Sequence, residues 1–202
     1  MVSFMKKIAI DKAIRRIKKA KSAFEKCKAS SNHEQYTEHW AEFLISSAAV
    51  FNILEAGCRN TPQGRQWYGG KRREGKNDPL VLHMRQARNE EEHGIEPVTK
   101  IEPGGIEIGA SGEPFHIKHL RLGGPDSLSQ ILNPNNYYGA PPTVSIIPPK
   151  PVLLTITSKE GDKFPPPTEH LGDSIKGLHI FAIAELYISY IENIIIEAET
   201  HV

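Results

Sequence analysis

Two long amphipathic stripes joined by a short turn are the feature that most restricts the fold of this 202-residue sequence. Apolar side chains recur at spacings of three and four from about residue 8 to 29 and again from 36 to 58, which is typical of one face of an α-helix. The connection between them, ASSNHEQ, offers Ser31 or Asn32 as the N-terminal cap of the second helix. Because the connection is short, the two helices should pack as an antiparallel hairpin.

Two further helices are predicted. The first spans Pro79–His93, with the Asp78 carboxylate as its cap, proline in its first turn and Gly94 at its end. The last runs from about residue 168 to 200 and is apolar around most of its circumference, so we expect it in the middle of a bundle and at a dimer interface. Residues 61–77, rich in glycine and basic side chains, are expected to form a loop.

Residues 95–167 have a different character, with dense glycine and proline and short β-type runs such as GGIEIGA and TVSII. We predict a β-hairpin or small sheet inserted between the third and last long helices. The predicted fold is therefore mainly α, an up-down four-helix bundle made of residues 1–94 and 168–202 with a β-rich insertion. The insertion contains His116 and His119, but no carboxylate or cysteine lies beside them at ligand spacing, so we predict no metal and no cofactor.

Composition favours a soluble globular protein, with 39% hydrophobic and 24% charged residues and a net charge of +1. The charge is unevenly distributed, since residues 1–30 carry ten lysines and arginines against two acids, whereas residues 168–202 carry six acids against one lysine. The basic character of residues 1–30 suggests an anionic partner. The first residues lack the long apolar region of a signal peptide, and charges interrupt the most apolar segment, so we expect a cytoplasmic protein without a membrane span.

The two cysteines, Cys27 and Cys58, fall at opposite ends of the predicted hairpin. Their expected separation is on the order of 40 Å at ~1.5 Å per helical residue, too far for a disulfide. Both are expected to be reduced thiols, in keeping with a cytoplasmic location.

The motif ARNEEEHG closes the predicted helix before residues 95–167. On an ideal helix Arg85, Arg88, Asn89 and His93 share one broad polar sector, with apolar residues opposite. Guanidinium and amide groups bind phosphate, and an imidazole transfers protons near neutral pH. This set would support RNA cleavage without a metal, with His93 as general acid or base, Arg88 on the scissile phosphate and Asn89 positioning either group. A symmetric dimer would supply the second histidine that acid–base catalysis usually needs.

The helical layout and this motif resemble the HEPN superfamily (higher eukaryotes and prokaryotes nucleotide-binding domains). Catalytic members carry an arginine, a polar residue directly after it and a histidine beyond four to six residues, the pattern of Arg88, Asn89 and His93 here. The resemblance implies a metal-independent endoribonuclease, of hydrolase type, that works as a homodimer with two motifs facing one cleft. It also implies a place among toxin–antitoxin pairs, phage defence or RNA processing. It covers residues 1–94 and 168–202 only.

Basic and aromatic residues between Arg59 and Lys76 lead into the motif helix. One interpretation is single-stranded RNA contact, with rings stacked on bases and cations on phosphates. The other is a solvated loop whose rings cover the end of the bundle. The candidate RNA-binding residues are Arg65, Trp67, Tyr68, Lys71, Arg72, Arg73 and Arg85. The family resemblance adds Glu38 or Glu42 of the second helix as a group that orients His93, against the alternative of plain surface carboxylates.

Two functions remain open on sequence alone. The first is HEPN-type RNA cleavage, with RNA, a second copy of the chain and an antitoxin protein as candidate partners. The second is a non-catalytic HEPN-like RNA-binding or protein-interaction dimer, in which Arg88 pairs with Glu92. The enzyme requires Arg88 and His93 exposed in a cleft close to another base, whereas the second alternative predicts Arg88 held by glutamates and His93 in bulk water.

Overall fold

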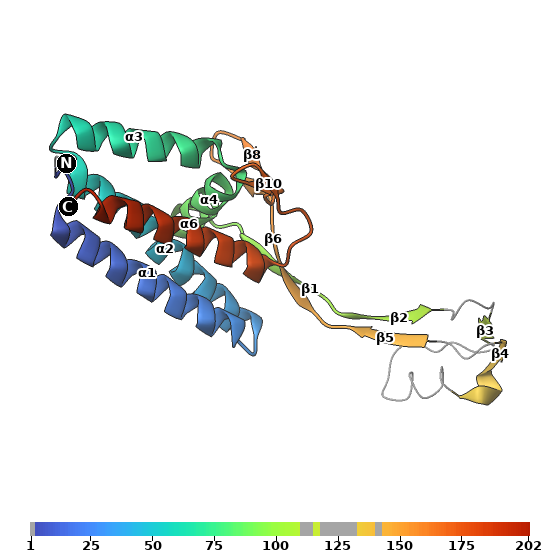
Figure 1. Ribbon diagram of the computed structural model, residues 1–202. Helices are drawn as coiled ribbons and strands as arrows, with labels where there is room; N and C mark the ends of the chain where they lie inside the picture. Colours follow the sequence, from blue (N-terminus) through green and yellow to red (C-terminus); the bar gives the residue numbers. More distant parts are fainter. Residues whose placement is uncertain (1–2, 110–114, 118–132, 140–142) are drawn as a thin grey trace. The chain divides into compact units, whose positions relative to one another are not determined.

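The computed structural model describes residues 3–109, 115–117, 133–139 and 143–202. They form two compact units, Met1–Lys100 with Pro151–Val202 and, separately, Ile101–Lys150. The described elements, shown in Figure 1, are α1 (Lys7–Lys28), α2 (His33–Cys58), α3 (Pro62–Asn77), α4 (Pro79–His93), β1 (Thr99–Glu102), β2 (Gly105–Gly109), β3 (Phe115–Ile117), a 3-10 turn (Pro134–Asn136), β4 (Tyr137–Gly139), β5 (Thr143–Ile147), β6 (Lys150–Leu153), β7 (Ile156–Thr157), β8 (Lys163–Phe164), β9 (Glu169–His170), β10 (Asp173–Ser174) and α6 (Ile180–Glu199). The fold is mainly helical with small antiparallel strand pairs.

The α1–α2 hairpin is confirmed, and the two helices run side by side (Figure 1). The Oδ1 of Asn32 accepts a hydrogen bond from the Gln35 amide at 2.9 Å, which caps α2. Phe24, Trp40 and Phe43 are fully buried, and the ring of Phe43 contacts the other two in the core. The repeating apolar stripes therefore face each other as their spacing predicts.

Residues 62–77 form the helix α3, so the expectation of a loop there was wrong. Thr61 Oγ1 caps α3 by accepting from the Gly64 amide at 3.0 Å, and proline follows at the first helical position. Tertiary contacts then offset the low helix propensity of four glycines. The indole Nε1 of Trp67 donates to Glu197 at 2.6 Å, and Lys71 pairs with the same carboxylate at 2.6 Å.

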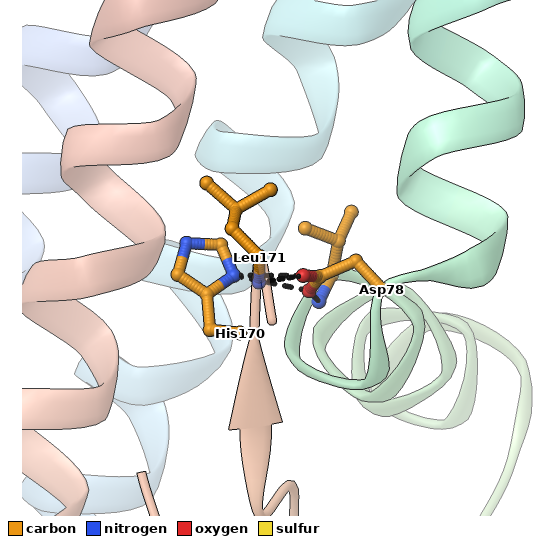
Figure 2. A network of polar contacts seen from close by, with 4 residues as sticks. Asp78, His170 and Leu171 are labelled. Carbon is orange, nitrogen blue, oxygen red and sulfur yellow. Dashed lines mark hydrogen bonds and ion pairs between the residues drawn. The ribbon is translucent and has the colours of Figure 1, made fainter. Parts of the chain in front are cut away.

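α4 begins and ends where the sequence predicts, and its cap is part of a buried network (Figure 2). The Asp78 carboxylate accepts from the Val81 amide at 2.9 Å, from the Leu171 amide at 2.7 Å and from His170 Nδ1 at 3.0 Å. Asp78 and His170 are both buried. This network holds the β9–β10 hairpin against the junction of α3 and α4, where the chain changes direction.

The last helix is shorter than predicted, since α6 starts at Ile180 and not near residue 168. The twelve preceding positions form the β9–β10 hairpin and its flanking turns. Leu171, Gly172 and Gly177 all have positive φ angles, which are incompatible with a right-handed helix. The last helix can therefore begin only after Gly177.

One helix of the described residues, α2, is long and apolar enough to cross a bilayer by length and composition. Its apolar side chains, Trp40 and Phe43 among them, are buried in the core of the first unit. Core helices of globular proteins commonly share this property, so it is weak evidence for a span.

The second unit is a set of antiparallel strand pairs, which confirms the β-type character of this part of the chain. β2 pairs with β5, with Ile106 opposite Ile146, and β3 pairs with β4, with His116 opposite Tyr138. His119 lies outside the described residues. The unit is shorter than the insertion expected at 95–167, because β7 and β8 pack with the helices of the first unit.

Candidate functional site

A pocket of about 400 Å³ is lined by residues of four helices, α2, α3, α4 and α6. Basic side chains from two of them line it, Lys71 and Arg72 of α3 with Arg85 and Arg88 of α4. The remaining lining residues are Ala48, Phe51, Asn52, Glu55, Tyr68, Gly75, Val81, Asn89 and Tyr187. Cations gathered beside apolar and aromatic walls form a site suited to an anionic ligand with an apolar or aromatic part.

Arg88 is held by two partners on its own helix. Its Nη2 lies 2.7 Å from Glu92 Oε2, and its Nη1 donates to Asn89 Oδ1 at 3.1 Å. The buried Nε has no hydrogen-bond partner among the described residues. The side chain is 25% exposed, so the guanidinium is held in one orientation while part of it still faces the pocket.

His93 lies on the other side of Asn89 from Arg88. It is 63% exposed and lines a second pocket, of about 300 Å³, between the end of α4 and the segment Ile156–Glu160. We expected one shared polar sector, but about 140° of helix separates Arg88 from His93, and Asn89 forms the border between their two pockets. Glu92 links the two sides, because the same Oε2 lies 3.8 Å from His93 Nε2.

The three glutamates of the motif have separate environments. Glu90 Oε1 accepts from the Ile95 and Glu96 amides, each at 3.0 Å, and so closes the end of α4. Its carboxyl group occupies the place where a side chain at Gly94 would begin, so a residue with a Cβ there would displace it. Burial raises the pKa of Glu91, and neighbouring Glu90 raises it further. Only Glu92 is engaged by the arginine of the motif.

The predicted RNA-contacting residues divide into two groups. Lys71, Arg72 and Tyr68 line the Arg88 pocket, together with Arg85 of α4. Burial raises the pKa of the Tyr68 phenol, as expected for a ring set into the pocket wall.

The other three predicted RNA contacts are not among the residues that line this pocket. Trp67 packs against Phe4 and His201, and its indole is engaged by Glu197, which leaves little ring surface for a base. Arg65 donates to the Arg59 carbonyl at 3.0 Å, while Arg73 is exposed on α3.

The structure brings neither Glu38 nor Glu42 to His93. Glu38 is exposed, and Glu42 pairs with Lys19 at 2.7 Å and accepts from Ser46 Oγ at 2.7 Å. Lys19 holds the pKa of the Glu42 carboxyl below its usual range, with Ser46 acting in the same direction.

Sequence reasoning missed two residues that α2 contributes to the Arg88 pocket, Asn52 and Glu55. The available signal was a pair of polar side chains three residues apart in the last turns of an otherwise apolar helix, which places both on one face.

No protein-family model matches this chain, no curated protein is significantly similar to it, and no solved structure matches it. The site must therefore be interpreted from its own chemistry. Within the described ranges, no cluster of three or more histidine, cysteine or acidic side chains is placed to hold a metal ion.

Proposed function

We propose that this chain is a metal-independent endoribonuclease of the HEPN type, with an up-down helical bundle that acts as a homodimer. The observation that supports this best is the gathering of basic side chains around Arg88 in one pocket, which shares Asn89 with the pocket that His93 lines. An arginine from a basic pocket and an exposed imidazole thus lie close together on the same helix. Exposed apolar side chains on α1 and α6, Ile8 and Ile196, offer surface for a second copy.

The proposed reaction needs no group beyond these side chains. Lys71, Arg72 and Arg85 attract the RNA backbone, and Arg88 binds the oxygens of the scissile phosphate. One imidazole accepts the proton of the ribose 2′-hydroxyl, whose oxygen attacks the adjacent phosphorus. A second imidazole, from the other copy, donates a proton to the leaving 5′-oxygen. The products are a 2′,3′-cyclic phosphate and a free 5′-hydroxyl, so atoms and protons balance.

The test is cleavage of a mixed RNA pool by the full chain in the presence of EDTA. Wild-type protein should cut and leave 5′-hydroxyl ends, and both His93→Ala and Arg88→Ala should abolish cutting. His33→Ala, which removes an exposed imidazole at the start of α2, is the matched control and should cut normally. Absence of cutting by the wild type, or cutting that survives His93→Ala, would exclude this mechanism.

A non-catalytic RNA-binding or protein-interaction dimer is the second candidate function. The observation that favours it is the engagement of Arg88 by Glu92 and Asn89, with His93 outside the basic pocket. In that case labelled single-stranded RNA should bind wild type without being cut, and Arg85→Ala should weaken binding because it removes a cation from the pocket. Wild-type protein that neither cuts nor binds RNA would leave only protein interaction.

A further inference from the structure

The pocket beside His93 joins the motif to a part of the chain that sequence reasoning left without a role. One wall is the C-terminal end of α4, with Gln86, Asn89 and His93. The other is Ile156–Glu160, which comprises β7 and the start of the turn into β8. Because Asn89 lines this pocket and the basic pocket, the two sites adjoin.

The turn between β7 and β8 is well organised. The amide of Ser158 donates to the Asp162 carbonyl at 2.8 Å, and the Asp162 amide donates to Ser158 Oγ at 3.2 Å. Gly161 adopts a φ of 90°, which favours glycine at this position. Lys159 is thus carried on a formed turn and not on a loose segment.

The β7–β8 segment is also held firmly against α4. Ile156 is buried in the core, and His83 Nδ1 lies 2.9 Å from the Pro165 carbonyl oxygen. The wall that carries Lys159 is therefore positioned before any ligand arrives, which lowers the entropy lost on binding.

The polar groups of the pocket suit a sugar-phosphate. Lys159 is exposed and forms no ion pair within the part of the chain that the structure describes. Thr157 and Ser158 carry hydroxyl groups, and Asn89 carries an amide. Two carboxylates also line the pocket, those of Glu90 and Glu160. Glu90 already accepts hydrogen bonds from two backbone amides, which reduces its repulsion of an anion, and Glu160 is exposed to solvent.

We propose that this pocket is the subsite for the nucleotide next to the cleaved phosphodiester, and that Lys159 binds the phosphate of that nucleotide. This inference rests on the proposed RNA-directed function. A strand with one phosphate at Arg88 would pass over Asn89 and His93 and then reach Lys159. The imidazole would lie between the two bound phosphates, beside the nucleoside that joins them. With Lys159 on the 5′ side of the cleaved bond, that nucleoside carries the attacking 2′-hydroxyl, and the leaving 5′-oxygen lies on the far side of the phosphate held by Arg88.

The test is the affinity of the full chain for a labelled 2′-O-methyl RNA decamer, which has no 2′-hydroxyl to react, at several KCl concentrations. Lys159→Glu should weaken binding about tenfold and reduce the slope of log K against log salt by about 0.7, because one phosphate contact is lost. The matched control is Lys163→Glu, with the same charge change on β8 opposite Thr157. It does not line the pocket and should leave affinity within about twofold.

The comparison of variants separates a failure of this inference from a failure of the proposed function. If Arg88→Ala weakens binding but Lys159→Glu does not, the RNA site stands and the subsite is excluded. Equal losses for Lys159→Glu and Lys163→Glu would show general repulsion and would also exclude it. If the wild type binds no RNA, both proposals fail. Lys159 is exposed, so a thermal melt of the variant should match that of the wild type.

Discussion

The α1–α2 and α3–α4 pairs share one local design, two helices joined by a short turn with a side-chain cap, yet they are stabilised differently. In the first pair the cap, Asn32, is exposed, and matching apolar stripes hold the helices together along their length. In the second pair the cap, Asp78, is buried, and its carboxylate accepts hydrogen bonds from His170 and Leu171 as well as from its own helix. The chain turns sharply there, so α3 and α4 meet mainly at their junction (Figures 1 and 2).

The two helix pairs differ in how far along the chain their stabilising contacts reach. The hairpin depends chiefly on contacts between its own two helices, such as Phe24 with Phe43, and these rings pack in addition on Phe181 and Tyr187 of α6. The second pair depends on partners far along the chain, since His170 lies 92 residues from Asp78 and Glu197 lies 130 residues from Trp67. The basic pocket lies on this second pair, so its geometry depends on the same long-range contacts.

The largest change in the free energy of unfolding should come from removal of the capping side chains of α4 and α2. Asp78→Ala leaves three donors without their acceptor, one of them a buried imidazole, and should lower the free energy of unfolding by about 3 kcal/mol. Asn32→Ala removes one exposed cap bond and should lower it by about 1 kcal/mol. Urea denaturation of both variants measures the difference. Equal losses would contradict the distinction between the two pairs.

The carboxylate of Glu92 on α4 should affect RNA binding more than it affects the stability of the fold. Glu92 competes with phosphate for Arg88, so Glu92→Gln should tighten binding of the 2′-O-methyl RNA decamer about threefold to tenfold. Stability should change by no more than about 0.5 kcal/mol, because the pair is an i,i+4 contact near the surface. Glu91→Gln removes the same charge next to it without touching Arg88 and is the control. Equal tightening in both variants would show that only net charge matters.

The buried histidine of α4 should make stability depend on pH. Burial lowers the pKa of His83, so the folded protein keeps it neutral while the unfolded chain binds a proton below about pH 6.5. Stability should therefore fall as pH decreases through that range, by at most about 1.4 kcal/mol per pH unit from this group. His83→Gln removes the titration and keeps a donor for the Pro165 carbonyl. Unfolding curves of the two proteins that stay parallel between pH 7 and 5 would contradict this.

The smallest effect concerns the glycines of α3. A Cβ at Gly70 meets open space, so Gly70→Ala should raise the free energy of unfolding by about 0.5 to 1 kcal/mol through better helix propensity. Gly64→Ala is the contrasting variant, because its Cβ would overlap the Cys58 carbonyl, and it should destabilise. Thermal unfolding of the pair measures the difference. Destabilisation by Gly70→Ala would mean that this face of α3 has a partner.

The elements that sequence analysis placed correctly are those whose signals are local in the sequence. For α2 and α4 the apolar spacing, a capping side chain and a following turn lie within the same thirty residues, and for α1, which has no side-chain cap, the apolar spacing and the following turn were sufficient. The loop expected at 61–77 was wrong because the glycine content outweighed the Thr61–Pro62 start signal. Glu197, which binds two side chains of this helix, is also far away in the sequence. Likewise nothing local showed that His170 would bind Asp78.

The candidate site shows the same division. Helical geometry alone placed Arg85, Arg88 and Asn89 on one side of α4, because residues three and four apart share a face. Which other elements complete the two pockets depended on chain packing, so Asn52, Glu55 and the Ile156–Glu160 segment were not anticipated.

Local periodicity and capping chemistry therefore determined the helical frame and the polar character of α4, because both act within a few turns of one helix. Only the tertiary structure decided that α3 is a helix, that Arg88 and His93 face different pockets, and that Lys159 comes close to the motif. Those outcomes depend on contacts between residues distant in sequence, whose free energy no local pattern contains.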